Sequence, residues 1–199
     1  MKAFIRIIIL SLLALTSIDS NAQFGVGFRD NRYIYGDFCF LNHWVIKLEQ
    51  SVYSEKIGYQ YLRGYCGYKG QVQNFAYKAQ AYFGSPYNRA YYSTGALIDG
   101  SYTFINRIKV NATLNPHYDS SIGYKTCFYA GAGVRIIRDI DILAGYTTIP
   151  TYRESEKRIL AGFDFHIANM SVIPQISIAA GGNTKAKSLR PMIGFNYQF

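Results

Sequence analysis

The chain has 199 residues, enough for one domain with a sizeable core but short for two. Charged residues make up only 17% of it, against roughly 25% in ordinary soluble domains, and aromatic residues also reach 17%. The net charge is +9, but the basic residues are scattered singly, so a nucleic-acid partner is not indicated. Attraction to anionic lipid or to sugar phosphates fits this charge better.

The first 22 residues have the pattern of a secretory signal peptide. Lys2 and Arg6 flank the start of an apolar run that covers residues 7–15, and small residues follow at the two positions that a signal peptidase reads. The run is too short to cross a bilayer as a helix. We therefore expect residues 1–22 to be removed and residues 23–199 to form one barrel domain.

Apolar and polar residues alternate with a period of two over almost the whole mature chain, and helical periodicity is absent. In RIKVNATLNP, for example, Ile108, Val110 and Leu114 share one face, opposite Lys109 and Asn111. The segments run roughly 10–14 residues, close to the 9–11 that cross a bilayer as a strand. Strands are expected at 23–29, 32–41, 43–54, 57–68, 72–84, 90–104, 107–116, 121–136, 139–150, 157–168, 170–181 and 188–199.

The connections between these segments alternate between short and long. Tight turns are expected near 41–42, 69–71, 105–107, 137–139 and 168–169, and longer polar loops near 54–56, 84–90, 116–121, 151–156 and 181–188. Such alternation is typical of outer-membrane barrels, whose short turns face the periplasm. The sequence thus predicts an all-β fold, a closed antiparallel up-and-down transmembrane β-barrel of about twelve strands. A ten-stranded barrel and a soluble, secreted β-sandwich that acts as a binding protein are the alternatives.

If the apolar faces meet lipid, the opposite faces form the interior. The polar residues expected there are Asp37, Lys47, Glu49, Lys78, Asp99, Lys109, Lys125, Arg135, Asp139, Asp141, Arg158, Asp164, His166 and Arg190, joined by Tyr33, Tyr35, Tyr82 and Tyr129. These groups either satisfy one another and fill the lumen, or they line a narrow, slightly cationic pore for small or anionic solutes.

One expected strand does not fit this pattern. In residues 57–68 the alternation assigns Tyr61, Arg63 and Tyr65 to the lipid side. An arginine in mid-bilayer would cost about 2–4 kcal/mol. Either Arg63 therefore lies near a membrane boundary, or a bulge reverses the alternation there.

Few residues suggest catalysis or metal binding. Asp164 and His166 share a strand face, and Ser171 and Ser177 lie on the neighbouring segment, so a hydrolase site at the barrel rim is an alternative function. No nucleophile motif marks either serine, so we expect no enzymatic activity. The dispersed histidines suggest no metal, and no cofactor is expected. The chain has three cysteines, Cys39, Cys66 and Cys127. They are expected either as small strand side chains or as one disulfide with one free thiol.

The chain ends on the segment IGFNYQF, in which Ile193, Phe195, Tyr197 and Phe199 alternate with smaller or polar residues. This ending resembles the C-terminal strand of Gram-negative outer-membrane β-barrel proteins. The start NAQF after the signal is similar to exported proteins of the Bacteroidetes. The resemblance implies that these four residues form the recognition signal for the barrel-assembly machinery.

The resemblance also implies a location in the cell outer membrane. The expected partners are outer-membrane lipid, the barrel-assembly machinery, and small solutes or another envelope protein. We expect a non-enzymatic protein that serves as a narrow channel or as a structural or accessory subunit.

Overall fold

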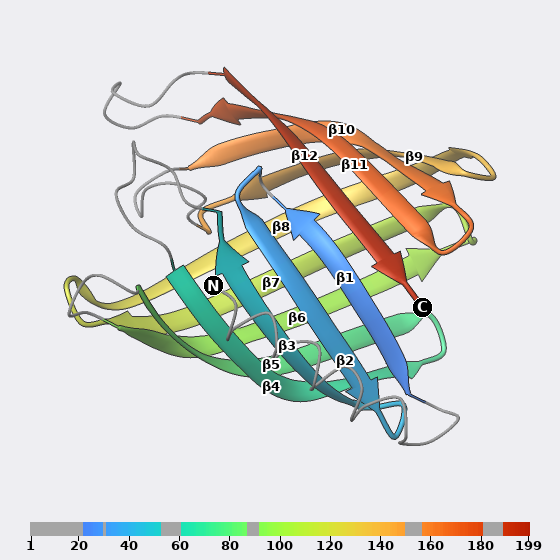
Figure 1. The fold of residues 1–199 in the computed structure, drawn as a ribbon. Coiled ribbons are helices and arrows are strands. Elements are labelled where there is room, and N and C mark those ends of the chain that lie inside the picture. Colours follow the sequence, from blue (N-terminus) through green and yellow to red (C-terminus); the bar gives the residue numbers. More distant parts are fainter. Residues whose placement is uncertain (1–21, 30, 53–60, 87–91, 150–156, 181–188) are drawn as a thin grey trace.

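The computed structural model describes residues 22–29, 31–52, 61–86, 92–149, 157–180 and 189–199, so the expected signal peptide lies almost wholly outside them. Among the described residues, no helix is long and apolar enough to cross a membrane. Twelve strands close into one antiparallel barrel in which β12 pairs with β1 (Figure 1). They are β1 Gln23–Arg29, β2 Tyr33–Phe40, β3 Trp44–Ser51, β4 Tyr61–Val72, β5 Phe75–Pro86, β6 Ser93–Phe104, β7 Ile108–Asp119, β8 Gly123–Ile137, β9 Ile140–Thr147, β10 Arg158–Ile167, β11 Met170–Ala179 and β12 Leu189–Gln198.

The prediction of a closed, twelve-stranded antiparallel barrel is confirmed, and the barrel is neither ten-stranded nor a sandwich. Every strand pairs with its neighbours in the sequence, as period-two alternation separated by short connections requires.

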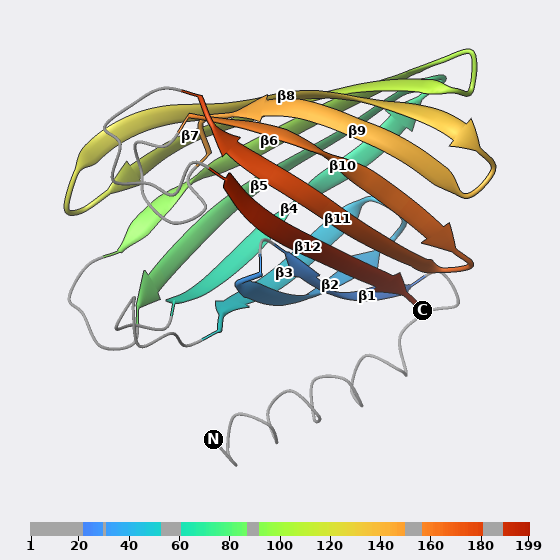
Figure 2. The same ribbon diagram turned by 90° about the horizontal axis from the view of Figure 1, so that it is seen from above.

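The barrel has two unlike ends (Figure 2). The short connections after β2, β4, β6, β8 and β10 lie at one end together with Phe199, and we call this the turn end. The opposite strand ends, with the described turn between β7 and β8, form the end that we call the loop end. Some predicted connections overlap strands: residues 69–71 belong to β4, which turns at Gln73 and Asn74, residues 84–86 belong to β5, and residues 116–119 belong to β7.

The outer face of the barrel is a continuous apolar surface. Exposed residues on it include Ile34, Ile46, Leu48, Phe83, Ile98, Leu114, Phe128, Ile142, Ile159, Phe163, Ile176 and Ile193. Aromatic rings border this surface: Trp44 packs edge-on against Tyr68 at the turn end, and Tyr92, Tyr118 and Tyr124 form a row at the loop end. An apolar band between two aromatic girdles is the surface of a transmembrane barrel.

Strand β4 faces the opposite way from the prediction. Its ladder with β3 pairs Lys47 with Tyr65 and Glu49 with Arg63, and paired residues of a ladder share a face. Tyr61, Arg63 and Tyr65 therefore point into the barrel, and their assignment to lipid is wrong. No bulge is involved, because the register of β4 is continuous with both neighbours. Within the described strands, a register shift occurs only between β8 and β9, at Arg135 and Ile137.

Bulky inward side chains lie flat against the wall where a neighbouring strand carries glycine. A Cβ on Gly145 of β9 would lie 2.7 Å from the Tyr129 ring of β8, and a Cβ on Gly67 of β4 would lie 2.1 Å from the carbonyl oxygen of Ala79 on β5. These glycines permit close approach of side chains and backbone between neighbouring strands.

The last strand closes the barrel. The alternation read from its sequence holds, since Ile193 and Phe195 pair with Pro174 and Val172 of β11 in an unbroken ladder. At the turn end the Phe199 backbone N–H donates to the carbonyl oxygen of Phe24 at 2.8 Å, and the two rings are 5.5 Å apart.

Candidate functional site

The ladder registers place the strand residues of the predicted lumen set on one face of the sheet. Asp37 pairs with Lys47, Lys78 with Asp99, Arg135 with Asp141, and Asp141 with Asp164, each directly across a ladder. This face encloses the interior, because it carries the side chains buried opposite the apolar outer surface. Tyr33, Tyr35, Lys109, Lys125, Tyr129, Arg158, His166 and Arg190 share it. Asp139 does not, since it lies exposed in the turn between β8 and β9.

A cluster of charges surrounds Glu49 in the loop-end half of the lumen, and we call it the Glu49 cluster. The Glu49 side chain is 1% exposed. Arg29 reaches it across β2 in a two-pronged contact of 2.8 and 2.9 Å, and Lys47 Nζ lies 2.9 Å from Oε2. The Tyr65 hydroxyl donates to Oε1 at 2.9 Å, and Arg63 Nη1 is 3.9 Å from the same oxygen. Three cations thus surround one carboxylate, which leaves the cluster net positive.

Tyrosine rings flank the cations of this cluster. Lys47 Nζ lies 4.4 Å from the ring centre of Tyr35, and the Arg63 guanidinium lies 4.9 and 4.7 Å from those of Tyr61 and Tyr82. Cation–π contacts of this kind become stronger where water is excluded. Because Tyr61 and Tyr82 are buried, these rings narrow the lumen instead of offering free stacking surfaces.

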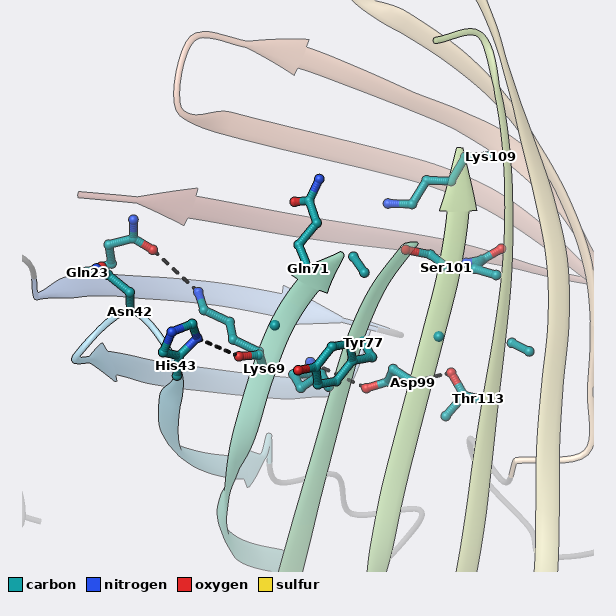
Figure 3. Close-up of a pocket in the computed structure, with 16 residues that line it drawn as sticks. Gln23, Asn42, His43, Lys69, Gln71, Tyr77, Asp99, Ser101, Lys109 and Thr113 are labelled. Carbon is teal, nitrogen blue, oxygen red and sulfur yellow. Dashed lines mark hydrogen bonds and ion pairs between the residues drawn. The ribbon is translucent and has the colours of Figure 1, made fainter. Parts of the chain in front are cut away.

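A cavity of about 730 Å³ opens at the turn end, against the inner wall of β1 and β4–β7, and we call it the vestibule (Figure 3). Three lysines line it, whereas Asp99 is the one carboxylate among its lining residues. Its polar lining consists of Gln23, Asn42, His43, Lys69, Gln71, Tyr77, Lys78, Asp99, Ser101, Lys109, Asn111 and Thr113.

The vestibule lysines differ in how firmly they are held. Lys78 Nζ lies 3.5 Å from Asp99 Oδ2, and Lys69 Nζ lies 3.4 Å from the side-chain oxygen of Gln23. The Thr113 hydroxyl donates to Asp99 at 2.7 Å, which fixes that carboxylate. Lys109 has no ion-pair partner among the described residues, and Figure 3 shows it reaching inward from β7. A solute that enters the vestibule therefore meets loosely held ammonium groups.

A second group of charges lies at the turn end of β8–β11, and we call it the Asp141 cluster. His166 Nε2 lies 3.2 Å from Asp141 Oδ2 and 3.7 Å from Asp164 Oδ2. Arg135 Nε donates to Asp141 at 3.0 Å, and the Ser171 hydroxyl donates to Asp164 at 2.5 Å. The pair Asp164 and His166, singled out from the sequence, thus comes together with Ser171.

Neither candidate serine is hydrogen-bonded to His166. The Ser171 hydroxyl proton is directed to the Asp164 carboxylate and not to His166. Ser177 is fully buried, and its hydroxyl accepts a hydrogen bond from the Arg158 guanidinium. A hydrolytic serine needs a base within hydrogen-bond reach, and for the half-buried Ser171 that neighbour is the Asp164 carboxylate instead of His166.

The cysteines and histidines form no metal centre within the described part of the chain. Cys39, Cys66 and Cys127 lie in β2, β4 and β8, and no disulfide joins them. Of the two alternatives predicted for the cysteines, small strand side chains agree with the structure and a disulfide does not.

Sequence reasoning missed several lumen residues. Arg29 ends the segment QFGVGFR on the face of Gly25 and Gly27, so its alternation could have marked it as inward-facing. Lys69 was not assigned to the lumen, because residues 69–71 were predicted to form a turn. Asn115 donates to the Tyr82 hydroxyl at 3.2 Å, a contact between strands that no local pattern reveals.

No protein-family model matches the chain, and no curated protein matches it. Solved outer-membrane barrels do resemble it in fold. The KdgM porin is 9% identical, with a TM-score of 0.62 over 89% of this chain and 98% of KdgM. Omp33 from Acinetobacter baumannii is 9% identical, with a TM-score of 0.54 over 89% of this chain and 95% of the Omp33 chain. An outer membrane channel from Pseudomonas putida F1 is 11% identical, with a TM-score of 0.52 over 92% and 97%. At these identities the likeness establishes the barrel fold alone.

Proposed function

We propose that this chain is a narrow outer-membrane channel for small anionic solutes. The observation that carries the proposal is the excess of cations along the inner wall of β1–β7. In the loop-end half, Arg29, Lys47 and Arg63 surround Glu49. In the turn-end half, three lysines share the vestibule with Asp99. Rings of like charge in a confined, low-dielectric passage favour ions of the opposite sign.

Within the loop-end half, Arg63 is the cation best suited to meet a solute. Its Nη1 atom donates to the Tyr65 hydroxyl at 3.2 Å and lies 3.9 Å from Glu49, whereas its buried Nε atom has no hydrogen-bond partner among the described residues. A guanidinium keeps five donors in a fixed fork, so Arg63 has donors left for a carboxylate or phosphate. The buried tyrosines beside it restrict the passage to small or slender solutes.

The fold and the sequence of residues 1–22 and 189–199 support a location in the outer membrane. The apolar outer band suits hydrocarbon, residues 1–22 suit export, and the terminal aromatic strand suits recognition by the barrel-assembly machinery. Short turns would then face the periplasm, and the vestibule would open to it.

Acidic sugars are a solute class worth testing. The structure of KdgM, which shares the barrel fold, was solved in complex with oligogalacturonate. Uronic acids carry one carboxylate for each sugar ring, which matches an inner wall with cations spaced along it.

Planar-bilayer electrophysiology tests the proposal. The mature chain, refolded and inserted, should conduct, and its reversal potential in a tenfold KCl gradient should show a preference for chloride over potassium. Replacing Lys69, Lys78 and Lys109 by Gln together should move that potential toward cation preference. Lys157→Gln is the control, because Lys157 lies exposed at the loop end outside the lumen.

Three outcomes decide between the alternatives. A potassium preference in the wild type would refute an anion channel. Insertion without conductance would favour a sealed structural or accessory barrel. Equal shifts from the triple variant and from Lys157→Gln would show that the vestibule does not select the ion.

A further inference from the structure

The ladder that closes the barrel is short at the loop end. β1 and β12 are in register over four pairs, from Gly25 with Gln198 to Phe28 with Phe195, whereas β11 and β12 are in register over nine. β1 ends at Arg29, but β12 extends back to Leu189. Figure 1 shows the two strands side by side, with β12 continuing past the end of β1.

Beyond the end of β1, the Asn31 side chain makes hydrogen bonds to β12 in place of the β1 backbone. Arg32 donates its N–H to the carbonyl oxygen of Arg29 at 3.0 Å, so the backbone folds back toward β2. Asn31 Nδ2 donates to the carbonyl oxygen of Pro191 at 2.8 Å, and the N–H of Ile193 donates to Asn31 Oδ1 at 2.7 Å.

These two bonds reproduce one rung of the ladder. The register of β1 with β12 would place positions 30 and 32 opposite Ile193 and Pro191. A primary amide offers one acceptor and donors on a single plane, as successive peptide groups of a strand do. Asn31 can hold this position because it adopts φ 55°, a left-handed conformation that asparagine tolerates better than most residues.

The residues of β12 beside this rung separate the lumen from the lipid side. Met192 points inward and is 7% exposed, whereas Ile193 points outward and is 46% exposed. Opening the wall here requires two hydrogen bonds to a solvent-exposed side chain to break, and water can replace both. Opening the rest of the seam breaks a ladder of four residue pairs, whereas the ladders between the other neighbouring strands have seven to twelve pairs.

We propose that Asn31 is a latch on this seam, and that its release lets the barrel open sideways between the β1–β2 turn and β12. The opening would connect the lumen beside Met192 with the outer apolar surface beside Ile193. The inference depends on the seam geometry and not on the solute that the channel carries.

Amide hydrogen exchange of the refolded barrel in micelles tests the latch. The Ile193 N–H points to Asn31, whereas the Met192 N–H points to β11, because the Gln198 N–H donates to Asn169 and N–H directions alternate along a strand. In Asn31→Ala, the Ile193 amide should exchange about tenfold faster, and the Met192 amide should keep its rate.

Asn106→Ala is the matched control, since Asn106 also sits in an exposed turn with φ 55° but lies far from the seam. It should leave Ile193 unchanged. Equal acceleration of Ile193 and Met192 in Asn31→Ala would overturn the latch, as would no acceleration of either.

The wild-type protein provides a second test that needs no variant. Release of the latch from the loop end should expose Ile193 before Phe195, which is the next residue on the same edge and is in register with Phe28. Faster exchange at Ile193 than at Phe195 is expected. Equal protection of the two amides would contradict an opening that begins at Asn31.

Discussion

Glu49 and Asp141 are both lumen carboxylates that bind an arginine, yet their surroundings differ sharply. The Glu49 side chain is 1% exposed and contacts Arg29, Lys47 and Tyr65, whereas the Asp141 side chain is 17% exposed and its partner Arg135 is 46% exposed. Water can solvate the ions of the Asp141 cluster, but the Glu49 cluster must satisfy its own charges. A carboxylate–guanidinium pair should therefore contribute substantially to stability in the Glu49 cluster and little in the Asp141 cluster.

The largest expected effect comes from Glu49→Gln. Removing the carboxylate leaves three cations close together with no counter-ion, and breaking a buried pair in this way costs about 3–5 kcal/mol. The midpoint of urea unfolding of the detergent-refolded barrel, followed by gel mobility without boiling, should fall accordingly. Asp141→Asn is the matched control, and an equal loss in both variants would mean that burial does not distinguish the two clusters.

Gly67→Ala should have the next largest effect, because it tests how closely the wall packs beside the Glu49 cluster. The new Cβ would lie 2.1 Å from the carbonyl oxygen of Ala79, so the backbone must move, at about 1–3 kcal/mol. In Gly133→Ala on β8 the new Cβ would lie 3.0 Å from the flexible end of Leu143 and at an ordinary 3.7 Å from the Ile142 carbonyl oxygen, so this substitution should cost less. The same unfolding assay compares them, and a greater loss at Gly133 would contradict this difference in packing.

Arg135→Gln should change stability little. Half-exposed ion pairs contribute about 0–1 kcal/mol, and salt screens them further. Unfolding midpoints measured at low and at high KCl should differ from the wild type by no more than this, and the difference should shrink with salt. A loss that persists at high salt would mean that Arg135 supports the bulge between β8 and β9 through packing instead of charge.

Much of the fold could be predicted from the sequence because each strand of a barrel carries its own period-two pattern. Ile46 and Leu48 alternate with Lys47 and Glu49, and this alternation predicts which face of β3 points outward. The faces of β4 were predicted wrongly because tyrosines occupy both of them: Tyr61 and Tyr65 point inward, while Tyr68 points outward. The tertiary contacts of Arg63 with Glu49 and Tyr82 settle its orientation, and local sequence contains none of them.

The candidate site was predictable in its residue types but not in its groupings. Alternation placed Lys47, Glu49 and Asp141 on inner faces, but it could not tell which charges would meet across two or more strands. Arg29 and Glu49 are separated by β2, and their contact depends on the stagger of three strands. The turn at Gln73 was missed because a glutamine with φ 51° carries no residue-type signal for a reversal, unlike the glycine at position 70.

His166→Ala should have the smallest effect on stability, because His166 belongs to the Asp141 cluster, which is open to water. The imidazole is 36% exposed, and its nearest polar contact is 3.2 Å from Asp141, so its loss should cost no more than about 0.5 kcal/mol. Hydrolysis of a chromogenic ester by the purified barrel should stay at the buffer background with and without this substitution. Ester hydrolysis that disappears in both His166→Ala and Ser171→Ala would instead mean that the Ser171 hydroxyl leaves Asp164 for His166 during turnover. The Asp141 cluster would then be a hydrolase site, and its exposure to water would be a requirement of the reaction rather than a sign of weak structural importance.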